Sequence, residues 1–121
     1  MPPGQRFDAR GLWAFSGSLT LNECGLDVPF LFDAAVYVYT QSGATILGQI
    51  GTIAATGNVD EIAEEWTLLG ATSCDAITLC CSASGFRAYE LGNSVPAGFV
   101  LSVACPGGLT CNVGYLGTAR R

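Results

Sequence analysis

The sequence predicts an all-β protein, an antiparallel β-sandwich of jelly-roll type with seven or eight strands and one short helix near residues 59–69. Three observations predict this class. Apolar and polar residues alternate along several stretches, glycine and proline recur between those stretches, and 121 residues suffice for one domain with an apolar core. Several short strands with turns at this spacing are typical of sandwiches, jelly rolls and closed barrels.

The first strand is expected at residues 12–21, where one parity is apolar and the other carries serine and threonine. Residues 1–11 before it are expected to form an extended N-terminal arm, and residues 12–121 a single β-sandwich domain. An arm that packs against neighbouring molecules would use its apolar side chains. We therefore expect inter-subunit contacts from Phe7, Leu12 and Trp13.

The later strands follow from the same alternation. We expect them at residues 28–40, 44–55, 76–82, 85–91, 97–105 and 109–116, with turns at residues 41–43, 56–58 and 84–85. The last two strands should form a hairpin through Pro106-Gly107-Gly108, because proline sets a turn φ and glycine accepts a positive φ.

Residues 58–69 break the alternation. Asn58 can cap a helix, and Glu61, three residues later, can complete a capping box. Acidic side chains near that start would also interact favourably with the helix dipole. Apolar residues then recur at helical spacing, namely Val59, Ile62, Ala63, Trp66 and Leu69. These signals predict a short helix.

Charge and composition narrow the function. The net charge is −5, and the chain has five arginines but no lysine and no histidine, so extended phosphate contacts and nucleic-acid binding are not expected. Catalysis through histidine or lysine is impossible, and we predict no catalytic residue, no cofactor and no metal site. Paired-carboxylate hydrolysis, or calcium at the acidic residues 60–65, is the alternative. Only 12% of residues are charged and 50% are apolar, which favours contacts with partners.

Six cysteines require an explanation: Cys24, Cys74, Cys80, Cys81, Cys105 and Cys111. They are either buried reduced thiols or disulfides, and strand parity gives two candidate pairs, Cys105 with Cys111 across the hairpin and Cys74 with Cys80. Cys80 could instead bond to another subunit. The adjacent Cys80 and Cys81 should point in different directions. A cysteine-ligated metal or redox centre is a further alternative, although the spacing does not match common zinc sites.

Two segments carry a resemblance to a known class of proteins. They are Val95-Pro96-Ala97-Gly98-Phe99-Val100-Leu101 and Glu65-Trp66-Thr67-Leu68-Leu69-Gly70, which resemble stretches of decoration and fibre-head domains of tailed phages. The expected arm followed by a compact strand domain is similar to small β-rich decoration or cement proteins of bacteriophage capsids.

That resemblance implies a structural virion protein that stabilises a capsid through inter-subunit β and arm contacts. Its partners would be further copies of itself, the major capsid protein, or both, with no nucleic acid and no membrane. Since no signal-peptide pattern follows Met1, we expect synthesis in the host cytoplasm and a final place in the virion.

The alternative function is a small binding module, such as a fibre head or a glycan-binding domain. Exposed aromatic side chains would then form the binding surface. The candidates are Tyr37, Tyr39, Trp66, Tyr89 and Tyr115.

Overall fold

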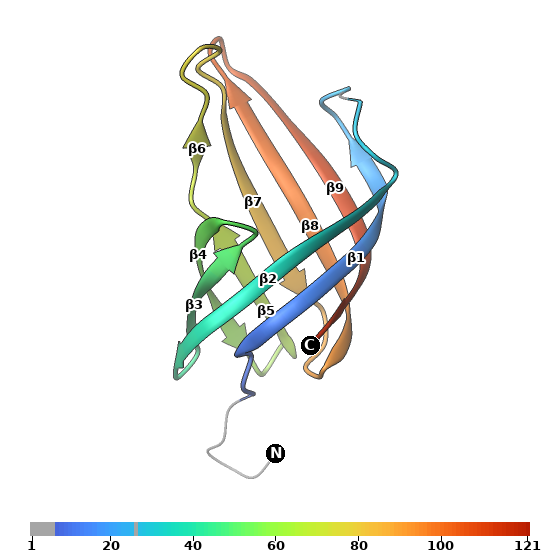
Figure 1. The fold of residues 1–121 in the computed structure, drawn as a ribbon, viewed down its shortest axis with the longest axis vertical. Helices are drawn as coiled ribbons and strands as arrows, with labels where there is room; N and C mark the ends of the chain where they lie inside the picture. The colour runs from blue at the N-terminus through green and yellow to red at the C-terminus, as the bar shows by residue number, and fades with distance from the viewer. Residues whose placement is uncertain (1–6, 26) are drawn as a thin grey trace.

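The computed structural model describes residues 7–25 and 27–121, and in these residues nine strands form one antiparallel sheet (Figure 1). The strands are β1 (Gly11–Asn22), β2 (Leu31–Ser42), β3 (Thr45–Ile50), β4 (Ile53–Asp60), β5 (Glu65–Gly70), β6 (Ser73–Cys74), β7 (Cys81–Ala88), β8 (Ser94–Cys105) and β9 (Leu109–Arg120). The predicted all-β antiparallel class is confirmed.

The sheet closes on itself. Its order is β5-β4-β3-β2-β1-β9-β8-β7-β6, and β5 also pairs with β7, which joins the two ends into a barrel of β1–β5 and β7–β9. The short β6 continues the β5 edge along β7 (Figure 1). Strands that are adjacent in the barrel follow one another along the chain, apart from the first and last strands, β1 and β9, which also pair. This up-and-down order contains no jelly-roll crossover, and the curved walls face one another across the core as the layers of a sandwich do.

Side chains fill the barrel interior at the end near the C-terminus. Trp13 of β1 and Trp66 of β5 lie with ring centroids 5.1 Å apart, and both are fully buried. The Trp13 indole N–H donates to the carbonyl of Ala9 at 2.8 Å, whereas that of Trp66 has no hydrogen-bond partner within the described part of the chain. The ring of Phe86 contacts that of Trp66, and further ring contacts continue from Phe86 to the rest of the aromatic core, namely Phe15, Phe32, Phe99 and Tyr115.

The end of the barrel near the C-terminus is covered by Arg121. Its guanidinium lies 4.7 Å from the ring centroid of Trp13 and 5.4 Å from that of Phe7, as in a cation–π contact. The same group donates to the carbonyl of Arg10 at 2.8 Å. Ala9 is fully buried and Phe7 packs against the core, so these two residues of the expected arm lie against the barrel. Residues 1–6 of that arm lie outside the described residues.

The predicted helix at residues 58–69 is wrong. Those residues form the end of β4, a turn and β5, and Val59 faces Trp66 directly across the two strands. Asp60, not Asn58, accepts the backbone N–H groups of Ile62 and Ala63, so the cap-like signal belongs to a turn. Ile62 is 98% exposed, because it sits at the turn and not on a buried helix face.

Several strand boundaries also differ from the prediction. The expected strand 44–55 is β3, a turn at residues 51–52 where Gly51 has φ 58°, and the start of β4. The expected turns at residues 56–58 and 84–85 lie inside β4 and β7, and residues 75–80 form a loop before β7. The hairpin at Pro106-Gly107-Gly108 is confirmed, with φ of 90° and 78° at its glycines.

Candidate functional site

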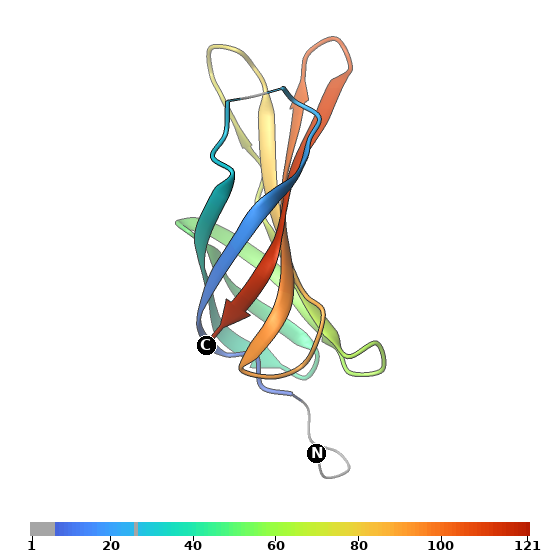
Figure 2. The same ribbon diagram turned by 90° about the vertical axis from the view of Figure 1, so that its right-hand side faces the viewer.

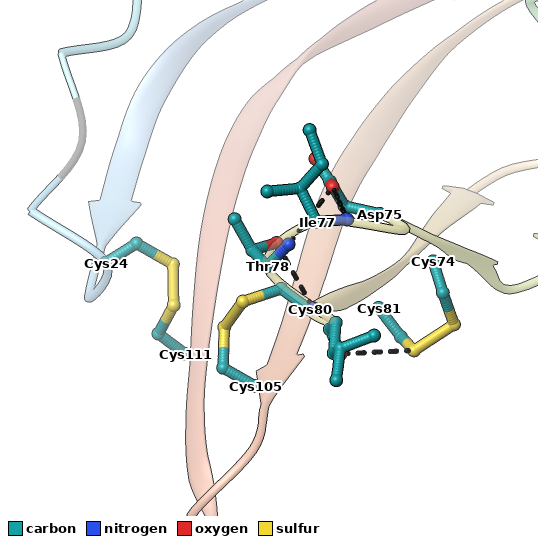
Figure 3. The surroundings of a disulfide bond; sticks show 10 residues. Cys24, Cys74, Asp75, Ile77, Thr78, Cys80, Cys81, Cys105 and Cys111 are labelled. Carbon is teal, nitrogen blue, oxygen red and sulfur yellow. Dashed lines mark hydrogen bonds between the residues drawn. A yellow bond between two sulfur atoms is a disulfide. The ribbon is translucent and has the colours of Figure 1, made fainter.

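Three disulfide bonds tie together the loops at the barrel end opposite the C-terminus (Figures 1 and 3). Cys24, just after β1, bonds to Cys111 of β9, and Cys80 bonds to Cys105 at the end of β8. Cys74 of β6 bonds to Cys81 of β7. All six cysteines are therefore paired within one chain, and the interpretation as reduced thiols is wrong.

Both predicted pairings are wrong for reasons of register. The three-residue turn sets Cys105 opposite Leu109 and Cys111 opposite Val103, so the two cysteines are not cross-strand partners. Cys74 lies opposite Cys81, not beside Cys80. The adjacent Cys80 and Cys81 bond to different neighbours, in agreement with the expectation that they point apart (Figure 3).

The loop between β6 and β7, residues 75–80, is named the tip loop here. The Asp75 carboxylate accepts the backbone N–H groups of Ile77 and Thr78, at 2.7 and 3.2 Å, and these two bonds lower its pKa. The Asp75 N–H donates to the Cys80 carbonyl at 2.8 Å, and Leu79 has a positive φ of 61°. Disulfides at both ends and these internal bonds define the conformation of the tip loop.

The tip loop presents apolar side chains to solvent. Ile77 is 92% exposed and Leu79 is 62% exposed, which is uncommon for large aliphatic residues held in a hydrogen-bonded loop. Leu109, at the neighbouring β8–β9 hairpin, is also exposed. Figure 2 shows these two hairpins projecting at the same end of the barrel.

A second feature is a hollow of about 600 Å³ on the outer surface of β5, β7, β8 and β9, named the outer groove here. It is lined mainly by residues whose parity directs them away from the core. These are Leu21, Thr67, Leu69, Gly85, Arg87, Tyr89, Gly98, Val100, Gly114 and Leu116.

Large and small residues alternate across this groove. One row crosses the strands as Leu69, Gly85, Val100 and Gly114, so that Val100 stands between two glycines. The adjacent row places Gly98 between Arg87 and Leu116. The hollow therefore comes from missing side chains on an apolar surface.

The side chains around the glycines remain open to solvent. Val100 is 41% and Leu116 is 51% exposed. A Cβ built on Gly98 would lie 3.0 Å from the Tyr89 hydroxyl oxygen and 3.2 Å from a methyl carbon of Leu116, so a larger residue there would fill the groove. Among the described lining residues, Arg87 is the charged one, and its guanidinium lies 6.0 Å from the Tyr89 ring centroid.

The structure separates the predicted contact residues. Leu12 points outward and is 62% exposed, but Trp13, one position later, points inward and is fully buried. Trp13 is therefore not available to a partner, because strand residues alternate between faces. Phe7 is half-buried beneath Arg121.

The predicted aromatic surface is likewise divided. Trp66 and Tyr115 belong to the core, so their place on a sugar-facing surface is wrong. Tyr37 and Tyr39 are exposed neighbours on β2 with ring centroids 4.7 Å apart, and the Tyr39 hydroxyl donates to the amide oxygen of Gln49. Tyr89 lines the outer groove.

No cluster of three or more potential metal ligands occurs within residues 7–25 and 27–121. Over the same residues, no helix has the length and apolarity needed to cross a membrane. The acidic residues at 60–65 serve in part to form the β4–β5 turn through the Asp60 carboxylate.

No protein-family model, curated protein or solved structure matches this chain. A sequence signal for the groove does exist. Phe99, Val100 and Leu101 are apolar in succession on a strand, which indicates a strand that is apolar on both faces.

Proposed function

We propose that this protein is a non-catalytic structural subunit whose copies assemble through the outer groove. The observation that carries the proposal is the exposed apolar surface around Val100 and Leu116, hollowed by glycines on three adjacent strands. Burying such a surface against a partner is favourable, at roughly 25 cal/mol per Å² of apolar area removed from water.

The composition of the groove supports this proposal further. Arg87 is the single charged residue among its described lining residues. Because none of these described lining residues is acidic, repulsion between two copies of net charge −5 is small at this surface. Alternating large and small residues also suit interdigitation with another apolar surface. The narrower role of a capsid decoration protein, located in a virion, rests on the resemblance in sequence and is part of the proposal.

The disulfides bear on where such an assembly would function. The chain has three disulfides. Disulfides persist in oxidising surroundings and are uncommon in the reducing cytosol. We propose that they form after the chain leaves that compartment, which fits a released particle as well as a secreted complex.

The test of this proposal is the oligomeric state of the oxidised protein by sedimentation velocity. We expect association between about 1 µM and about 1 mM, the range of moderate to weak affinity. Val100→Lys and Leu116→Lys should abolish it, whereas Leu47→Lys, at an exposed leucine on the outer face of β3, should not. A wild-type protein that stays monomeric throughout would refute assembly through the groove.

A second candidate function is glycan binding at Tyr37 and Tyr39. Two adjacent exposed tyrosine rings, with Gln49 oriented by the Tyr39 hydroxyl, offer stacking surface together with hydrogen-bonding groups. Titration of labelled protein with oligosaccharides should shift the resonances of β2, and Tyr39→Ala should remove the shifts. Unchanged spectra at millimolar sugar would eliminate this candidate.

A further inference from the structure

The tip loop has the properties of a docking element. It is closed at its base by Cys74–Cys81 and fixed to the neighbouring hairpin by Cys80–Cys105. Its most exposed apolar side chain is that of Ile77, whose own backbone N–H donates a hydrogen bond to the Asp75 carboxylate (Figure 3). Because the loop is held by covalent bonds, little conformational entropy would be lost when a partner binds it.

The outer groove has the complementary properties. The tip loop offers two aliphatic side chains, Ile77 and Leu79, and the groove offers a hollow of about 600 Å³ with an apolar lining. The hollow lies where Gly85, Gly98 and Gly114 leave space between larger side chains. An aliphatic projection and an apolar hollow are what a well-packed interface core requires.

The two surfaces also carry opposite charges. Asp75 of the tip loop is an exposed carboxylate, and the backbone N–H groups of Ile77 and Thr78 lower its pKa by stabilising the charged form. Arg87 supplies the positive charge of the groove, with its guanidinium near the Tyr89 ring and exposed. Opposite charges at the edge of an interface favour one docking orientation over others.

We propose that the tip loop of one copy inserts into the outer groove of a second copy, with Ile77 and Leu79 against Val100 and Leu116 and with Asp75 beside Arg87. This inference rests on the proposed function, because it names the partner of the same groove. Tip loop and groove are different surfaces, so the contact is heterologous. In each such pair the first copy keeps a free groove and the second keeps a free tip loop, so the assembly grows into a ring or an open chain.

The alternative is a two-fold pair in which two grooves face each other. That arrangement brings Arg87 of both copies into one interface, and no carboxylate is among the described residues that line the groove. It also leaves the exposed Ile77 without a contact. The heterologous arrangement buries Ile77 and supplies a carboxylate, and therefore fits the charges and the apolar surfaces better.

The first experiment compares two isoleucines in similar local settings. Ile77 follows Asp75 and Ile62 follows Asp60, each in a turn where the aspartate accepts the isoleucine N–H, and both side chains are almost fully exposed. In the oxidised protein, Ile77→Asp should weaken self-association about 30-fold or more, as expected when a buried aliphatic side chain is lost from an interface. Ile62→Asp, at the opposite end, should leave association unchanged.

A charge variant tests the pairing of Asp75 with Arg87. Asp75→Asn keeps an oxygen that accepts the two loop N–H bonds and removes the charge, so the loop conformation should persist. Its association should be about 3-fold to 10-fold weaker and less sensitive to salt than that of the wild type. Unchanged affinity and salt dependence would contradict the assigned pair.

The decisive experiment mixes two variants that are each unable to form chains. Ile77→Asp has an intact groove, and Leu116→Lys has an intact tip loop. At a concentration at which the wild type associates and Ile77→Asp does not, each variant alone should be monomeric, and together they should form a 1:1 dimer that grows no further. A mixture that stays monomeric overturns tip insertion. If groove variants abolish association while Ile77→Asp does not, tip insertion is also wrong, but assembly through the groove stands.

Discussion

Removal of the Cys24–Cys111 disulfide should destabilise the protein more than removal of Cys74–Cys81. The reason lies in the unfolded chain, where a cross-link between distant residues excludes more conformations than one between near residues. Cys24 and Cys111 are 87 residues apart in sequence, and Cys74 and Cys81 are 7 apart. The loop-entropy relation gives about 4.6 kcal/mol for the first bond and about 2.4 kcal/mol for the second.

The measurement is guanidinium unfolding of the double alanine variants Cys24→Ala/Cys111→Ala and Cys74→Ala/Cys81→Ala. Trp13 and Trp66 are fully buried, so their fluorescence reports loss of the barrel core. Far-UV circular dichroism of each variant is the control for an intact fold. The intact Cys80–Cys105 bond shortens the long loop and lowers the first value slightly, but the order of the two variants should persist.

The reasoning would be refuted if the two double variants lost equal unfolding free energy, or if the short-loop variant lost more. Either result would mean that local packing of the disulfide, rather than the length of the closed loop, determines its contribution. If a double variant does not fold, the order of the two disulfides is measured on the wild type, which is titrated with reductant. Mass spectrometry of the alkylated intermediates then identifies the most stabilising bond.

Leu68→Ala, in the core, should lower the unfolding free energy by about 2–5 kcal/mol, whereas Leu69→Ala, on the outer face, should change it by less than about 1 kcal/mol in the same denaturant titration. Gly48→Ala would place its Cβ 1.9 Å from a carbonyl oxygen of β2 and should lower the melting temperature clearly, at a cost of about 1–3 kcal/mol or more; Gly92→Ala, with its nearest atom at 3.5 Å, is the control and should be neutral. Hydrogen bonds from Arg10 lower the pKa of the Asp8 carboxyl from 3.8 to about 2, so the contribution of this pair to stability is present above about pH 4 and is lost as the pH falls toward 2. Asp8→Asn should flatten that part of the pH–stability curve, and an unchanged curve would contradict the assignment.

Alternation in the sequence was sufficient for the strands but not for their closure. Phe15, Phe99 and Tyr115 lie on the apolar parities of β1, β8 and β9, and all three are buried. The β5–β7 pairing that closes the barrel depends on register between strands separated by the tip loop, and single-strand parity contains no information on it. The helix prediction failed because Trp66 fits both periods: it is spaced from Ile62 and Leu69 as on a helix and from Leu68 as on a strand. The pairing of β5 with β4 and β7 selects the strand.

The cysteines show the same limit at the candidate site. Their participation in disulfides was one of three interpretations, and the partners depended on the turn length at residues 106–108 and on the position of β6. A shift of one residue in register exchanges the partner of every cysteine on a strand. The strand prediction used only the buried parity of each strand. It therefore did not identify the outer groove, which Val100 and Leu116 line on the opposite parity.

The arrangement of packing and disulfides explains how one small barrel can display so much apolar surface. Aromatic rings fill the end near the C-terminus, where Trp13 and Trp66 are buried, and the opposite end, where the strands extend beyond β3–β5, is held by the three disulfides. Covalent bonds there replace part of the core, so Ile77 is not needed inside and can face solvent. If this division is correct, Ile77→Asp should leave the unfolding free energy nearly unchanged while it weakens association. A stability loss comparable to that of Leu68→Ala would show instead that Ile77 is part of the packing of the barrel.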